Sequence, residues 1–92
     1  MSAKAEIGWR RVDEDGRRFQ VYARRVGKEW RFYERQARYD EWRQVTQPPL
    51  ADWLALLEAV RRRVPRRLVP PAELVRLRRQ VLALFPEAVL ES

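Results

Sequence analysis

Arginine and aromatic side chains are the residues of this chain with the most chemistry to offer. The 92 residues include 20 Lys plus Arg against 13 Asp plus Glu, together with 4 Trp and 3 Tyr, and the formal net charge is +7. Guanidinium groups bind phosphate oxygens, and aromatic rings stack on nucleobases. A chain of this composition suits an anionic partner if its fold brings the two residue types together.

Catalytic and metal-binding chemistry has little support in the sequence. Cys and His are both absent, which excludes disulfides, thiolate metal sites and imidazole-based acid/base catalysis. The densest acidic run, Asp13-Glu14-Asp15, leads into Gly16, and a hairpin turn explains its composition. The 3 glycines lie too far apart to form a phosphate-binding loop. We therefore predict that the protein is not an enzyme, with no catalytic residue, no metal site and no cofactor.

The first half of the chain has the pattern of a β-sheet. Between residues 7 and 45 the sequence alternates and is rich in aromatic and β-branched side chains. Asp15-Gly16 and Gly27-Lys28 are turn signals, and the second pair suits a two-residue hairpin loop. The sequence predicts strands near residues 7–12, 17–26, 29–36 and 41–45.

From Pro48 onward apolar residues recur at helical spacing. One helix is expected from the proline pair at 48–49 to Pro65, and a second from Pro71 to Phe85. The predicted fold class is α+β, an antiparallel meander of three to four strands followed by two helices packed on one face of the sheet. We expect a single domain over residues 1–92, with the sheet at 7–45 and the two-helix segment at 48–86.

The register of the second hairpin predicts a surface that we call the basic face. A two-residue Gly27-Lys28 loop pairs Val26 with Glu29 and sorts the side chains of both strands between the two sides of the sheet. One side carries Phe19, Val21, Ala23, Trp30 and Phe32. The basic face carries Arg18, Gln20, Tyr22, Arg24, Arg31, Tyr33 and Arg35. The alternatives are an ordinary solvated sheet surface, or a register shifted by one residue that reverses the assignment.

In this register Arg24 lies opposite Arg31. Like charges placed opposite each other destabilise a sheet by roughly a few tenths of a kcal/mol. A neighbouring group must offset this repulsion, and a bound phosphate could do so. The basic face is therefore a candidate surface for a single-stranded nucleic acid.

A second arginine-rich segment spans the end of the first predicted helix and the turn after it. Four of its arginines are candidate phosphate contacts, namely Arg62, Arg63, Arg66 and Arg67. The alternative is structural, because cations in the last turn of a helix complement its dipole.

The sides on which two tryptophans lie depend on turns of uncertain length. A first turn of two or four residues places Trp9 with Tyr22 on the basic face, whereas a turn of three residues places it inward. The side of Trp42 depends on the third turn. Trp30 and Trp53 are expected in the core.

Arg78 lies inside the apolar arc of the second predicted helix, where a charge is costly unless it is paired. We expect it either to reach an acid, with Glu34 the best candidate, or to extend outward between two packed surfaces.

We therefore predict a small basic nucleic-acid-binding module, with DNA or RNA as partner. The alternative is a protein-interaction or oligomeric regulatory module, forming a homodimer or binding an acidic protein. No uncharged run is long enough to span a bilayer, and no apolar leader is visible, so we expect no membrane association and a cytoplasmic location. Scarce heat-labile side chains suit a thermophile, although a GC-rich genome favours the same composition.

Overall fold

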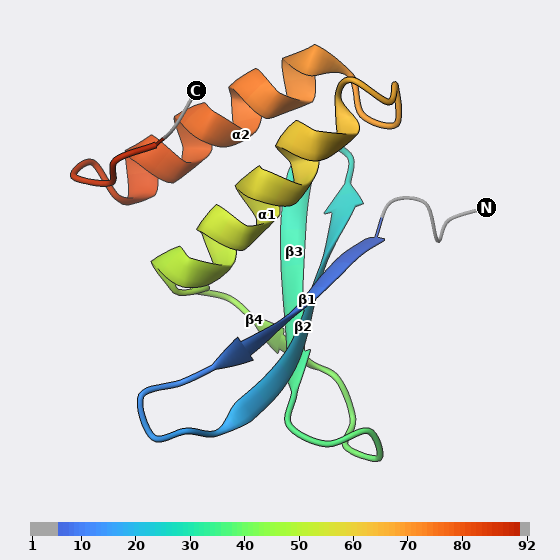
Figure 1. Ribbon diagram of the computed structural model, residues 1–92, viewed down its shortest axis with the longest axis vertical. Coiled ribbons are helices and arrows are strands. Elements are labelled where there is room, and N and C mark those ends of the chain that lie inside the picture. The colour runs from blue at the N-terminus through green and yellow to red at the C-terminus, as the bar shows by residue number, and fades with distance from the viewer. Residues whose placement is uncertain (1–5, 91–92) are drawn as a thin grey trace. The chain divides into compact units, whose positions relative to one another are not determined.

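The computed structural model describes residues 6–90 of the chain (Figure 1). An antiparallel sheet in the strand order β1-β2-β3-β4 is followed by two helices. The elements are β1 (Glu6–Val12), β2 (Arg18–Val26), β3 (Glu29–Arg35), β4 (Arg43–Val45), α1 (Leu50–Arg63) and α2 (Pro71–Leu84). The predicted α+β class, a meander of four strands followed by two helices, is confirmed.

The chain divides into two compact units, Met1–Pro48 with the sheet and Pro49–Ser92 with the helices. The boundary falls at the proline pair where the sequence changes from strand to helix spacing. That the units form one domain, with the helices packed on the sheet, stays a prediction. Within residues 6–90 neither helix has the length and apolar character needed to span a membrane.

The hairpin of β2 and β3 has the predicted register. Gly27 adopts a φ of +64°, in the left-handed region that glycine occupies at little cost. The two-residue turn pairs Val26 with Glu29, and Tyr22 consequently pairs with Tyr33. This pairing confirms which side chains of β2 and β3 share a side of the sheet.

The apolar side of the sheet is the buried one. Of the residues predicted for it, Val21, Ala23 and Phe32 are buried, while Phe19 and Trp30 are half-buried. Apolar side chains at alternate positions of neighbouring strands lie on the same side of the sheet. Burying their combined surface is favourable, so this side forms part of the core.

The turn between β1 and β2 determines the side of Trp9. The Asp13 N–H donates to the Arg17 carbonyl oxygen at 2.9 Å, which leaves a turn of three residues that ends at Gly16, with φ +82°. This turn pairs Trp9 with Val21 on the apolar side of the sheet. Of the two positions left open by the sequence, the inward one is observed.

The apolar side also contains an ion cluster around Glu34, which is 9% exposed. Its two carboxylate oxygens accept hydrogen bonds from Arg11 and Arg43, each at 2.5 Å. A buried carboxylate requires such partners, because the free energy of desolvating its charge is otherwise unfavourable. Glu34, the expected candidate partner of Arg78, is thus already bound by two arginines of the sheet.

α1 begins directly after the proline pair at 48–49, and α2 begins at Pro71, as predicted. Pro71 occupies the first turn of α2, where its missing N–H costs nothing, and α1 has Asp52 in its first turn. Leu56 and Val60 of α1 and Val81 of α2 are fully buried, so each helix has a buried apolar face.

Candidate functional site

The basic face consists of rows of side chains that run across the strands, because paired strand residues share a side of the sheet. The central row is Gly8, Tyr22, Tyr33 and Gln44. The row on one side of it is Glu6, Arg24 and Arg31, and the row on the other side is Arg10, Gln20 and Arg35. Two neighbouring tyrosines therefore lie between rows that contain arginine.

Trp42 completes an aromatic cluster on this face. The Tyr22 and Tyr33 rings are stacked, with centroids 4.8 Å apart and an interplanar angle of 17°. Trp42 meets Tyr22 edge-on at 4.7 Å and 86°. It directly precedes β4, whose first residue, Arg43, pairs on the opposite side of the sheet. Strand alternation therefore places Trp42 on the basic face, an assignment that the sequence left open.

Arg35 holds this cluster in place. Its guanidinium carbon lies 4.3 Å from the centre of the Trp42 ring, and its Nε donates to Gln20 Oε1 at 2.7 Å. A third interaction, from Nη1 to the carbonyl oxygen of Asp40, measures 3.5 Å. Arg35, predicted as a phosphate contact, is therefore already engaged with the aromatic cluster.

Glu6 offsets the repulsion between Arg24 and Arg31. Arg24 pairs with Arg31 on one side and with Glu6 on the other, and its Nη1 lies 3.9 Å from Glu6 Oε2. Both side chains of this ion pair are more than 40% exposed, so it contributes little to stability. The sequence required an offsetting group for this arginine pair but did not identify Glu6.

Three arginines of the basic face point into solvent. Arg10, Arg18 and Arg31 are exposed, and within the described residues none has a hydrogen bond, ion pair or ring contact. Arg10 was not among the predicted site residues, because its side of β1 depended on the first turn. These guanidinium groups are free to bind an anion.

Tyr22 is the titratable group of this face with a perturbed pKa. Partial burial raises the pKa of Tyr22 above its ordinary value, and the nearby Glu6 carboxylate and Tyr33 hydroxyl add to the shift. The Tyr22 hydroxyl therefore stays protonated and able to donate a hydrogen bond at neutral pH.

The predicted arginines of the helical unit have different environments. Arg62 Nη1 donates to Glu58 Oε2 at 3.1 Å, and Arg63 Nη1 donates to the Ala59 carbonyl oxygen at 3.1 Å. Arg66 and Arg67 are exposed in the turn after α1, and Arg67 adopts a φ of +61°. The side chains of Arg62 and Arg63 support their own helix, whereas those of Arg66 and Arg67 make no hydrogen bond or ion pair within the described residues.

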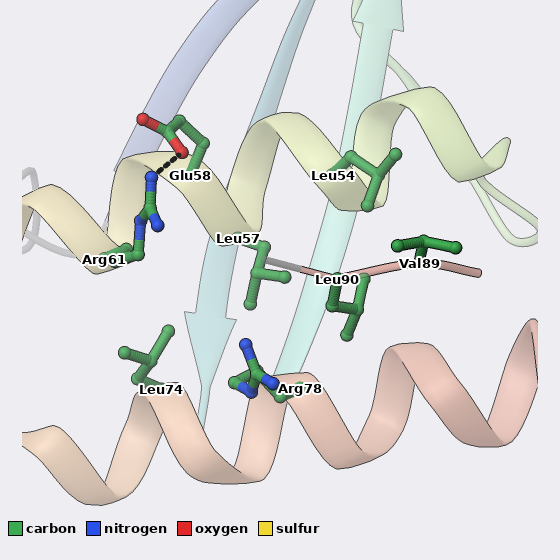
Figure 2. Close-up of a pocket in the computed structure, with 8 residues that line it drawn as sticks. All are labelled: Leu54, Leu57, Glu58, Arg61, Leu74, Arg78, Val89 and Leu90. Carbon is green, nitrogen blue, oxygen red and sulfur yellow. Dashed lines mark hydrogen bonds and ion pairs between the residues drawn. The ribbon is translucent and has the colours of Figure 1, made fainter. Parts of the chain in front are cut away.

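Arg78 lines a groove within the helical unit (Figure 2). The groove has apolar walls formed by Leu54, Leu57, Leu74, Val89 and Leu90. Arg78 is half-buried there, so its long side chain covers apolar surface while part of the residue stays in water.

Within residues 6–90 no group of three Asp or Glu side chains could hold a metal ion. Comparisons of the chain with protein-family models, curated proteins and solved structures give no match.

Proposed function

We propose that this chain binds single-stranded nucleic acid through the basic face of its sheet, without catalysing a reaction. The observation that carries the proposal is in the central row, where Tyr22 stacks on Tyr33. The rows on either side of it contain Arg10 and Arg31. A single strand presents phosphates along its backbone and bases beside them, and it therefore needs both kinds of partner close together.

Electrostatics supports this assignment. The formal net charge is +7, and three exposed arginines of the basic face, Arg10, Arg18 and Arg31, have no hydrogen bond or ion pair within the described residues. A bound phosphate releases counterions from the strand and relieves the repulsion between Arg24 and Arg31 that the weak Glu6 contact only partly offsets. Binding should therefore be sensitive to salt.

The aromatic cluster contributes the second part of the affinity. Base stacking on an exposed ring contributes about 1–3 kcal/mol for each base and is tolerant of sequence. Trp42 is 38% exposed, and Arg35 and Tyr22 hold it in place. A ring fixed before binding loses less conformational entropy when a base stacks on it.

The turn after α1 offers additional phosphate contacts. Arg66 and Arg67 are exposed in this turn, and their side chains have no hydrogen bond or ion pair within residues 6–90. We assign them an auxiliary role in binding. Arg62 and Arg63 can join them if Arg62 releases Glu58, and Arg63 releases the Ala59 carbonyl oxygen, to bind phosphate.

The test is the affinity for a labelled oligothymidine, measured by fluorescence anisotropy over a range of salt concentrations. Arg31→Gln should weaken binding and reduce the slope of log affinity against log salt by about one. The matched control is Arg79→Gln, because Arg79 is an exposed arginine of α2. This control should leave affinity nearly unchanged, and equal losses in the two variants would contradict the assignment to the sheet.

A protein-interaction module is the second candidate function, and exposed apolar side chains on α2 favour it. Val75 is 49% exposed, Leu82 39% and Leu84 54%. Apolar surface of this kind is often covered by another protein. Light scattering distinguishes the candidates. The second function would be favoured if the unaltered protein forms a homodimer but binds no oligonucleotide, and if Val75→Gln dissociates that dimer.

A further inference from the structure

We infer that the hollow above Gly8 on the basic face is a subsite for one nucleobase of the bound strand. The inference rests on the proposed function and names the place where a base enters. The hollow lies beside the aromatic cluster, and its lining includes Gly8, Arg10, Gln20, Tyr22 and Trp42.

The missing side chain of Gly8 makes the hollow. Gly8 occupies the β1 end of the central row, where Tyr22 pairs with it, and each other position of that row carries a side chain. Glycine inside a strand is unfavourable by roughly 0.5–1 kcal/mol relative to alanine, and it often marks a place where a ligand comes close.

The backbone gives no reason for glycine at this position. Gly16 and Gly27 have positive φ angles, whereas Gly8 does not. A Cβ atom added at Gly8 would lie 3.5 Å from the Val21 carbonyl oxygen and 3.8 Å from Tyr22 Cβ, which are ordinary contacts. A Cβ atom therefore fits at this position without a backbone clash, and a longer side chain would extend into the open space beside the rings.

The lining of the hollow suits a flat and polar ring. Trp42 and Tyr22 supply aromatic surface, and Trp42 is fixed by the guanidinium of Arg35. Gln20 Oε1 already accepts the Arg35 Nε, so its amide NH₂ is the end left to donate. A nucleobase can accept that hydrogen bond through a carbonyl oxygen or a ring nitrogen.

Arg10 completes the subsite at the rim. Its side chain is exposed and has no protein partner within residues 6–90. A guanidinium at the rim of the hollow can bind the phosphate of the same nucleotide, since it offers several N–H donors to two phosphate oxygens.

The decisive experiment fills the hollow with Gly8→Val and measures oligothymidine affinity, salt dependence and thermal stability. Valine suits a strand, so the melting temperature should stay the same or rise. Affinity should fall about tenfold because one base loses its stacking site, whereas the salt slope should not change because no phosphate contact is lost. The control is Gln47→Val, because Gln47 is exposed and lies outside the strands of the basic face, and it should leave affinity unchanged.

The outcomes separate this inference from the proposed function. If the unaltered protein fails to bind oligothymidine at low salt, the proposed function itself fails. If it binds and Gly8→Val binds equally well, the subsite alone is overturned.

A second variant keeps the inference testable if Gly8→Val does not fold. Arg10→Gln removes an exposed side chain that has no hydrogen bond or ion pair within residues 6–90. It should weaken binding and reduce the salt slope by about one. An unchanged salt slope in Arg10→Gln would also overturn the subsite.

Discussion

Tyr22 and Tyr33 stack across β2 and β3 with their ring centroids 4.8 Å apart and their planes inclined by 17°. They pair directly in the strand register, so the contact follows from the length of the Gly27-Lys28 turn. The stacked pair fixes the position of the ring surfaces that we assign to nucleic-acid binding.

The first prediction concerns the energy of this pair. A double-mutant cycle with Tyr22→Leu and Tyr33→Leu should give a coupling energy of about 1 kcal/mol, because stacked aromatic pairs contribute beyond their buried area. Urea unfolding of the two single variants and the double variant measures it. A coupling energy near zero would mean that the rings do not stack in solution.

The second prediction concerns the ion cluster on the apolar side of the sheet. Glu34→Gln should lower the free energy of unfolding by about 2 kcal/mol, because Arg11 and Arg43 would lose their charged acceptor. Glu41→Gln is the matched control, since Glu41 is exposed, and it should change stability by less than about 0.5 kcal/mol. Similar effects of the two changes would indicate that Glu34 is not buried.

The third prediction concerns the backbone after α1. Arg67 has a φ of +61°. Its N–H donates to the Val64 carbonyl oxygen, and the next N–H, of Leu68, donates to the Arg63 carbonyl oxygen. This is the hydrogen-bond pattern of a helix end that favours glycine. Arg67→Gly should therefore raise the free energy of unfolding by about 0.5–1 kcal/mol.

The control for this backbone effect is Arg66→Gly in the same turn. Arg66 has no positive φ, so glycine there adds only freedom to the unfolded chain and should destabilise the protein slightly. Thermal unfolding of both variants measures the difference. Stabilisation by both changes would point to relief of charge repulsion instead.

The fourth prediction concerns pH. Hydrogen bonds from the Arg17 backbone and side chain, and from the Asp15 N–H, hold the pKa of Asp13 below its ordinary value. A lowered carboxyl pKa gives stability that is present above about pH 4 and is lost as the pH falls through the lowered value.

Thermal unfolding measured between neutral and strongly acidic pH tests this effect. Asp13→Asn should lower stability at neutral pH and reduce the loss on acidification, because asparagine does not titrate. An unchanged acid profile in Asp13→Asn would contradict the role of Asp13 in the turn.

The elements and the basic face could be predicted because they depend on local signals. A two-residue turn at Gly27-Lys28 allows only one register, and alternation along the strands then assigns Tyr22, Arg24, Arg31 and Tyr33 to one side. Proline pairs likewise define where both helices begin.

Features that depend on longer turns or on other strands could not be predicted. The sides of Trp9 and Trp42 followed from loops whose geometry the sequence did not determine. Glu6 as a neighbour of Arg24, and Gly8 as a gap beside Tyr22, both required the register of β1. Residues 6 and 8 carry no signal of these roles in the sequence alone.

The central claim is that the basic face binds single-stranded nucleic acid, and amide and indole NMR shifts on addition of oligothymidine at low salt test it most directly. We expect the largest shifts at Gly8, Tyr22, Tyr33 and the Trp42 indole, with smaller shifts near Arg66 and Arg67. These shifts should disappear as salt is raised. The absence of shifts at low salt, or shifts confined to α1 and α2, would contradict the claim.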